Sequence, residues 1–186
     1  MRHIALVGMM GSGKSETGRG LALVLGCRFV DCDELVAAGA GRSIPEIFEA
    51  EGEAGFRRRE SETLAAVLAG PDAAVIATGG GVVTVAAGRA LLADAAVFWL
   101  RARPEVLADR VGDGTGRPLL ASGAGDRGAL ERLRQLVAER DRWYREVADV
   151  IVDVDDLSAS QAATAVARRL PEIAGWADGG LCEAAS

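Results

Sequence analysis

The chain has 186 residues and a formal net charge of -6, with 49% hydrophobic and 26% charged residues. This length allows one well-buried domain and is short for two. The acidic balance argues against nucleic acid as a partner, because duplex binding needs a basic face. No apolar run is long enough for a membrane helix, and the first residues lack a signal-peptide pattern. The three cysteines have no metal-ligand spacing, so we expect a cytoplasmic protein without a disulfide framework.

Strands and helices are expected to alternate along the chain. Residues 3–7 form an apolar run that ends in glycine, which predicts a buried strand, and 14–25 predict a helix that stops at Gly26. The further elements expected, in chain order, are strand 28–32, a helix opened by a capping box at Ser43–Glu46, helix 54–69, strand 74–77, helix 84–93, strand 96–100, helices 104–111 and 128–147, strand 150–154 and helix 158–170. Five nearly all-apolar strands separated by helices predict a parallel sheet covered on both faces, in one domain over 1–170.

The segment 112–127 is rich in glycine and too long for a plain connection between helices. The seventeen residues from Gly112 to Gly128 include six glycines, counting both ends. We therefore expect a lid over the substrates. The tail, residues 171–186, carries no pattern and is expected to be flexible.

The clearest motif follows the first predicted strand. Residues 8–15 read Gly-Met-Met-Gly-Ser-Gly-Lys-Ser, which fits the phosphate-binding pattern G-x-x-x-x-G-K-[ST] between a strand and a helix. Its glycines let backbone N–H groups face phosphate oxygens at a positive helix N-terminus. Lys14 should reach the β- and γ-phosphates of ATP, and Ser15 should bind one Mg²⁺ ion. Lys14 is the only lysine in the chain, which argues against a glycine-rich turn of no function. We expect the nucleotide to contact Gly11, Ser12, Gly13, Lys14, Ser15 and Glu16.

A magnesium site also needs a carboxylate. Two apolar runs end in aspartate, one at Asp31 and Asp33 and the other at Asp153. The first pair follows the second strand, at the sheet edge where parallel sheets bind ligands. Alternation along a strand would put both side chains on the same side. Asp33 could alternatively cap a helix over 34–39.

The ordered set of motifs resembles that of the shikimate kinases, from the first strand to about residue 170. The set comprises the phosphate loop, Asp31-Cys32-Asp33, Phe56-Arg57-Arg58-Arg59-Glu60, Thr78-Gly79-Gly80-Gly81, Arg117-Pro118-Leu119-Leu120, and Glu139-Arg140 ahead of Trp143-Tyr144. The resemblance implies a three-layer α/β/α sandwich of the P-loop NTPase type with strand order 2-3-1-4-5. It also implies transfer of phosphate from ATP to the 3-hydroxyl of shikimate, in aromatic amino-acid biosynthesis. We expect a monomer whose partners are ATP or ADP and shikimate.

The resemblance assigns roles on the acceptor side. Asp33 would bind ring hydroxyls of shikimate and help to deprotonate the attacking one, and Asp31 would hold a magnesium-bound water. Arg57 and Arg140 would clamp the carboxylate of shikimate, and Glu60 would orient Arg57 from one helical turn away. Composition alone would instead place Arg57 on a solvated helix face.

The resemblance assigns further roles around the phosphates. The backbone amides of Gly79, Gly80 and Gly81 would face shikimate, although such a triplet could be an ordinary strand-to-helix turn. Arg117, within the lid, would reach the transferring phosphate. Arg110 would stack on adenine.

Three features depart from the family pattern: Glu16 replaces a hydroxyl residue, the loop 153–158 is acidic, and the tail has no counterpart. Glu16 would face the phosphates or pair with Arg19. The alternative function is a related kinase acting on gluconate, a cyclitol or a nucleoside monophosphate. A second alternative, a nucleotide-binding protein without turnover, would be expected to lose Lys14, Asp33 or Arg117.

Overall fold

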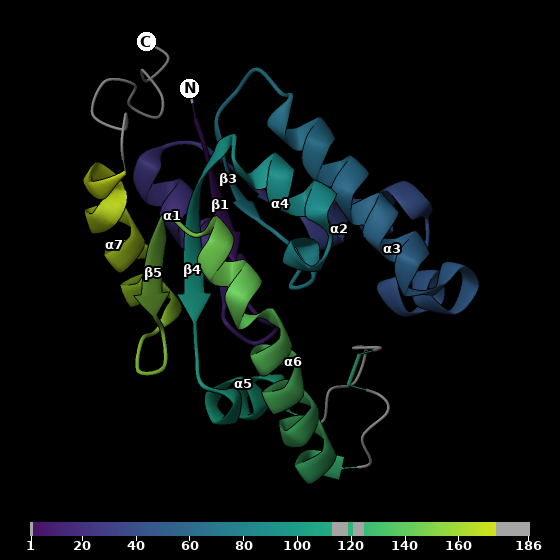
Figure 1. The fold of residues 1–186 in the computed structure, drawn as a ribbon. Helices are drawn as coiled ribbons and strands as arrows, with labels where there is room; N and C mark the ends of the chain where they lie inside the picture. Colours follow the sequence, from purple (N-terminus) through teal and green to yellow (C-terminus); the bar gives the residue numbers. More distant parts are fainter. Residues whose placement is uncertain (1, 113–118, 121–124, 174–186) are drawn as a thin grey trace.

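The computed structural model describes residues 2–112, 119–120 and 125–173, with side chains omitted for 125–127, and contains one five-stranded sheet (Figure 1). The strands are β1 (His3–Val7), β2 (Arg28–Asp31), β3 (Ala74–Ala77), β4 (Ala95–Arg101) and β5 (Val150–Asp153). Every pairing is parallel, and the order is β2-β3-β1-β4-β5. The predicted sheet and its strand order are thereby confirmed.

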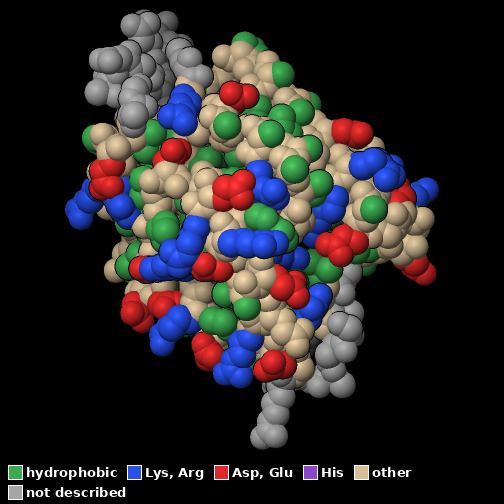
Figure 2. Space-filling model, in the orientation of Figure 1, with side chains coloured by type: hydrophobic (Ala, Val, Ile, Leu, Met, Phe, Trp, Pro, Cys, Tyr) green, Lys and Arg blue, Asp and Glu red, His purple; other side chains and the backbone are tan. Residues whose placement is uncertain are grey.

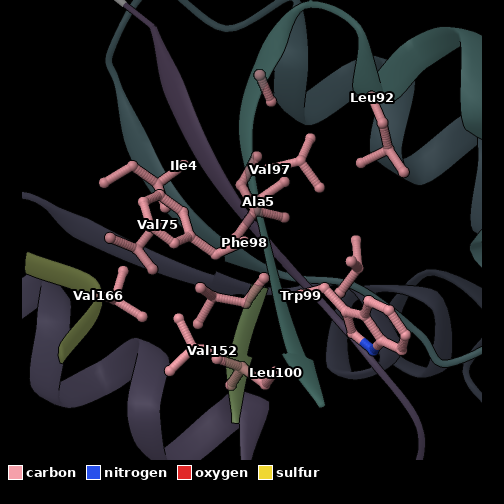
Figure 3. Packing of buried hydrophobic residues seen from close by; sticks show 14 of the residues in the cluster. Ile4, Ala5, Val75, Leu92, Val97, Phe98, Trp99, Leu100, Val152 and Val166 are labelled. Atoms are coloured by element: carbon pink, nitrogen blue, oxygen red, sulfur yellow. The ribbon is translucent and has the colours of Figure 1, made fainter. Parts of the chain in front are cut away.

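The central strands are buried on both faces, which explains why their sequences are continuously apolar. All five residues of β1 are buried, and its neighbour β4 is buried from Ala95 to Leu100. Ile4, Val75 and Phe98 cluster on one side of the sheet, and Trp99 and Leu92 lie on the other (Figure 3). Each large aliphatic side chain buried in this way contributes roughly 1.5–3 kcal/mol.

In the described parts of the chain, seven α-helices surround the sheet. They are α1 (Lys14–Leu25), α2 (Cys32–Ala40), α3 (Ile44–Leu68), α4 (Ala86–Leu92), α5 (Pro104–Val111), α6 (Gly125–Val147) and α7 (Ala159–Arg169). Helices α1 and α7 pack together over one face, and α4 and α6 cover the other (Figure 1). Helices α2 and α3 pair beside β2. The carboxyl ends of the strands are left open to a site.

Several element boundaries differ from the sequence expectations. The predicted strand 28–32 ends at Asp31, because Cys32 already belongs to α2. The two helices expected on either side of Gly52 are present as the two parts of α3, which kinks at that glycine (φ 68°, ψ 178°). The helix expected over 84–93 begins instead as a 3-10 turn, η1 (Val82–Thr84), followed by α4.

The two segments expected to be mobile are described only in part. Residues 113–118, which include the predicted lid residue Arg117, and 121–124 lie outside the described residues, as do 174–186. Residues 125–127, expected in the lid, belong to α6. A 3-10 turn, η2 (Leu170–Glu172), leads into the tail, and Ile173 packs in the core.

Basic and acidic side chains are interspersed on the face shown in Figure 2. Ion pairs among the described residues include that of Arg145 with Asp141 at 2.6 Å. No helix in the described part of the chain has both the length and the apolar character needed to cross a lipid bilayer.

Candidate active site

The phosphate-binding loop joins β1 to α1. Gly8 has a φ of 147°, and a Cβ there would lie 2.5 Å from the carbonyl oxygen of Leu100. Gly13 caps α1 in the left-handed conformation, with φ 81°. Lys14 begins α1 and donates hydrogen bonds from Nζ to the carbonyl oxygens of Gly8 (3.0 Å) and Met9 (2.9 Å). The lysine ammonium is therefore already folded back over the loop.

A cavity of about 500 Å³ opens over this loop, a volume typical of small-molecule sites. The predicted nucleotide residues among its lining are Gly11, Ser12, Gly13, Lys14, Ser15, Glu16 and Arg110. Asp31 and Asp33 lie in its wall, and Val154 and Leu157 lie near Arg110. The fold thus brings the phosphate-binding loop, both aspartates and Arg110, the arginine expected to stack on adenine, to one cavity.

Asp31 and Ser15 form the candidate magnesium site. Ser15 Oγ donates a hydrogen bond to Asp31 Oδ2 at 2.6 Å. The other carboxylate oxygen, Oδ1, accepts from the backbone N–H groups of Asp33 (3.0 Å) and Glu34 (3.3 Å). These hard oxygen donors suit Mg²⁺, which completes its shell with phosphate and water oxygens. Within the described ranges, no three His, Cys, Asp or Glu side chains gather in an arrangement that could hold a metal ion.

Asp31, and not Asp33, is the helix cap. Its carboxylate caps α2, so the alternative role considered for Asp33 is wrong. The strand-alternation argument was also wrong, because Asp33 lies in the first turn of α2. The two side chains still meet at the cavity, because the helix starts directly at the end of β2.

Arg57 is buried, which rules out the solvated helix face that composition favours. Its side chain is 9% exposed. Nη1 donates to Glu60 Oε2 at 2.7 Å, and Nη2 donates to Glu53 Oε1 at 3.0 Å. The predicted orienting pair with Glu60 is therefore present. Sequence reasoning missed Glu53, although its position four residues before an arginine was a usable signal.

The glycine triplet is required by close approach. None of the three glycines has a positive φ. A Cβ at Gly79 would lie 2.0 Å from Glu60 Oε1, and one at Gly81 would lie 2.0 Å from Arg57 Cζ. Ion-paired side chains of α3 thus pack directly on this backbone, which an ordinary turn would not require.

Helix α6 closes the same wall from the other side. Arg140, which is 4% exposed, donates from Nη1 to the carbonyl oxygen of Gly80 at 3.1 Å. Tyr144 donates its hydroxyl to the same oxygen at 2.6 Å and stacks on Trp99 with 5.3 Å between ring centroids. Burial raises the pKa of Tyr144 well above its ordinary value. The sequence marked Tyr144 as part of a motif but did not indicate that it holds Gly80.

The acidic loop after β5 turns its charges away from the nucleotide cavity. Asp153 forms a two-bond ion pair with Arg101, and this hydrogen bonding lowers the pKa of Asp153. Asp155 pairs with Arg103 at 2.7 Å. Arg110 donates from Nη2 to the carbonyl oxygen of Val154 at 2.7 Å, which fixes the guanidinium at the cavity. Arg101 and Arg103 thus pair with two of the three aspartates of this loop.

Glu16 is exposed and lines the nucleotide cavity. The pairing considered for it with Arg19 is wrong, since Arg19 forms an ion pair with Glu34 at 2.6 Å and lies over the ring of Phe29.

Comparisons with known proteins agree on one family. A family model described as shikimate kinase matches residues 10–171. A shikimate kinase of Halorhodospira halophila is 48% identical over 171 residues, which cover 91% of this chain and 92% of that protein. One of Symbiobacterium thermophilum is 48% identical over 172 residues, covering 91% and 97%. A solved shikimate kinase of Acinetobacter baumannii, in complex with shikimate, superimposes with a TM-score of 0.87 at 36% identity, covering 92% of this chain and 94% of the other.

Proposed function

Since this chain belongs to the shikimate kinase family, we propose that it transfers the terminal phosphate of ATP to the 3-hydroxyl of shikimate. The observation that carries the proposal is the position of two buried arginines, Arg57 and Arg140, on either side of the glycine triplet. This triplet adjoins the phosphate loop, because Gly80 lines the nucleotide cavity. The site thus offers a carboxylate clamp beside a phosphate donor, as an acidic acceptor requires.

On the donor side, ATP lies along the cavity with its phosphates in the loop. Lys14 exchanges its bonds to Gly8 and Met9 for phosphate oxygens, and Arg110 packs on adenine. Ser15 and, through a bound water, Asp31 would hold Mg²⁺, which when bound would supply positive charge to the phosphates. Arg117 supplies a further positive charge from the lid.

On the acceptor side, Arg57 and Arg140 bind the carboxylate of shikimate, and the backbone of Gly79, Gly80 and Gly81 lines the ring. Asp33 binds the attacking hydroxyl and assists the loss of its proton. No covalent nucleophile is needed, because phosphoryl transfer asks for positioning and charge neutralisation.

The cellular setting stays a prediction from the sequence. We propose a cytoplasmic monomer of one domain, over 1–170, with no nucleic-acid or membrane partner.

The test is ADP release, followed with a coupled assay against a panel of acceptors: shikimate, quinate, gluconate, valiolone and nucleoside monophosphates. Shikimate should give the highest kcat/KM by a wide margin. A higher kcat/KM with gluconate or a cyclitol such as valiolone would support the alternative kinase, and no ADP release with any acceptor would contradict a catalytic role.

A further inference from the structure

Glu60 is a buried carboxylate whose second oxygen has no use in the function proposed above. Its side chain is 1% exposed. Oε2 accepts the hydrogen bond from Arg57, but Oε1 has no hydrogen-bond partner among the described residues. An unsatisfied buried carboxylate oxygen is costly as an anion and becomes a donor when it is protonated.

The free oxygen of Glu60 points to the glycine triplet, where α2 brings another acid. A Cβ at Gly79 would lie 2.0 Å from Glu60 Oε1 and 2.7 Å from Asp33 Oδ1. The two carboxylate oxygens are therefore within about 5 Å of each other, a distance at which like charges oppose ionisation. Burial is the main cause that raises the pKa of Glu60 above its ordinary value, Asp33 adds to it, and Arg57 opposes it.

The charges facing Glu60 come from three helices. Within α3, Arg57 forms ion pairs with both Glu60 and Glu53, so its positive charge is shared between two carboxylates. Helix α6 contributes the charge of Arg140, which lowers the pKa of Glu60, and the neutral hydroxyl of Tyr144. Helix α2 contributes Asp33 and the thiol of Cys32, whose pKa is raised to about 12, so that it is neutral. Glu60 is thus flanked by the guanidinium groups of Arg57 and Arg140 and by the carboxylate of Asp33, while Glu53 shares Arg57 with it.

We propose that Glu60 takes up a proton when the carboxylate of the acceptor binds to Arg57 and Arg140. This inference rests on the proposed function, which places that carboxylate on the two arginines. The carboxylate of the acceptor would compete with ionised Glu60 for the guanidinium of Arg57. It would also add a negative charge beside the carboxylates of Glu53, Glu60 and Asp33. A neutral Glu60 keeps its acceptor oxygen on Arg57 and gains a donor at the oxygen that lacks a partner. Acceptor binding is then linked to proton uptake, and it weakens as the pH rises.

Calorimetry of shikimate binding to the full chain, without nucleotide, tests this in buffers of different ionisation enthalpy. At neutral pH the parent should take up roughly half to one proton per shikimate bound. Glu60→Gln should bind shikimate with no proton uptake, while Glu53→Gln, which removes the half-exposed carboxylate on the same guanidinium, should retain it. A merely structural role of Glu60 would change affinity and leave the proton count unaltered.

Two results would overturn the inference alone: binding by the parent that is independent of buffer, or the same proton uptake in Glu60→Gln. Failure of the parent to bind shikimate would overturn the proposed function as well. If Glu60→Gln loses its native circular-dichroism spectrum, the inference can be tested on the parent by NMR, with carbon-13 at the side-chain carboxyl groups of its glutamates. On addition of shikimate, the chemical shift of one carboxyl carbon should change to the value of a protonated carboxyl group. An unchanged spectrum would contradict the inference.

Discussion

Gly81 packs against the guanidinium of Arg57, so closely that a Cβ at Gly81 would be 2.0 Å from Cζ and 2.1 Å from Nη1. The glycine therefore determines where the arginine sits, and it can be tested separately from the arginine itself.

Gly81→Ala should raise the KM for shikimate, because the new methyl group displaces the guanidinium. Losing a charge-assisted hydrogen bond costs about 1.5–3 kcal/mol, so we expect roughly a ten- to hundred-fold increase, with ADP affinity preserved. The matched control is Gly39→Ala on the exposed side of α2, where a Cβ would meet nothing within 4 Å. The control should leave the KM for shikimate unchanged. If Gly81→Ala also left it unchanged, the guanidinium of Arg57 could shift away from the methyl group without loss of shikimate binding.

Arg57→Ala and Arg140→Ala should each raise the KM for shikimate far more than the KM for ATP. The expected loss is again about 1.5–3 kcal/mol per arginine, measured by steady-state kinetics and calorimetry. Arg57→Ala should also destabilise the fold, because it leaves Glu60 buried without its partner. Arg58→Ala, in the exposed neighbour, is the control. Normal shikimate binding by both variants would refute the carboxylate clamp.

Asp33→Asn should lower kcat by about 10²–10⁴-fold while ADP affinity stays close to normal, because the carboxylate serves the acceptor hydroxyl and not the phosphates. The control is Glu34→Gln. Glu34 lies beside Asp33 in the first turn of α2 and forms an exposed ion pair with Arg19, so this variant should have little effect on kcat. If kcat in Asp33→Asn stayed within about threefold of the parent, Asp33 would not be the base.

Glu16→Thr should tighten ADP binding by about 1 kcal/mol, because it removes a carboxylate from the cavity that takes the phosphates. Arg19, three residues further along α1, pairs with Glu34 and so does not neutralise Glu16. Stability without ligand should fall slightly, since a glutamate in the first helical turn favours α1. ADP titrations at low and moderate salt measure the effect; equal affinities at both salts would mean that Glu16 does not face the phosphates.

The architecture was readable from the sequence because its signals are local and periodic. Apolar runs ending in Gly8 or Asp31, and the Gly26 stop, predict strands and helices without knowledge of the tertiary contacts. The phosphate loop was equally readable, since its chemistry requires a fixed spacing. Boundaries failed where a side chain decided them, as at Asp31, whose capping bonds end β2 one residue before the expected boundary and start α2 at Cys32.

What the sequence could not give was contact between distant segments. Glu60 and Gly79 are nineteen residues apart, and nothing local predicts that a carboxylate oxygen lies on that glycine. The pairing of Asp153 with Arg101 likewise depends on the register of β4 with β5. Such relations follow only from the assembled sheet.

The stack of Tyr144 on Trp99 gives the protein an intrinsic optical probe. Tyr144 spans the two halves of the site, because its hydroxyl bonds to Gly80 and contacts the sulfur of Met9 at 3.6 Å. Any shift of the phosphate loop or of the triplet must therefore disturb the ring that lies against the indole at an interplanar angle of 17°. Occupancy of either substrate position should then change the fluorescence of Trp99, so that donor and acceptor binding can be followed in real time without a label.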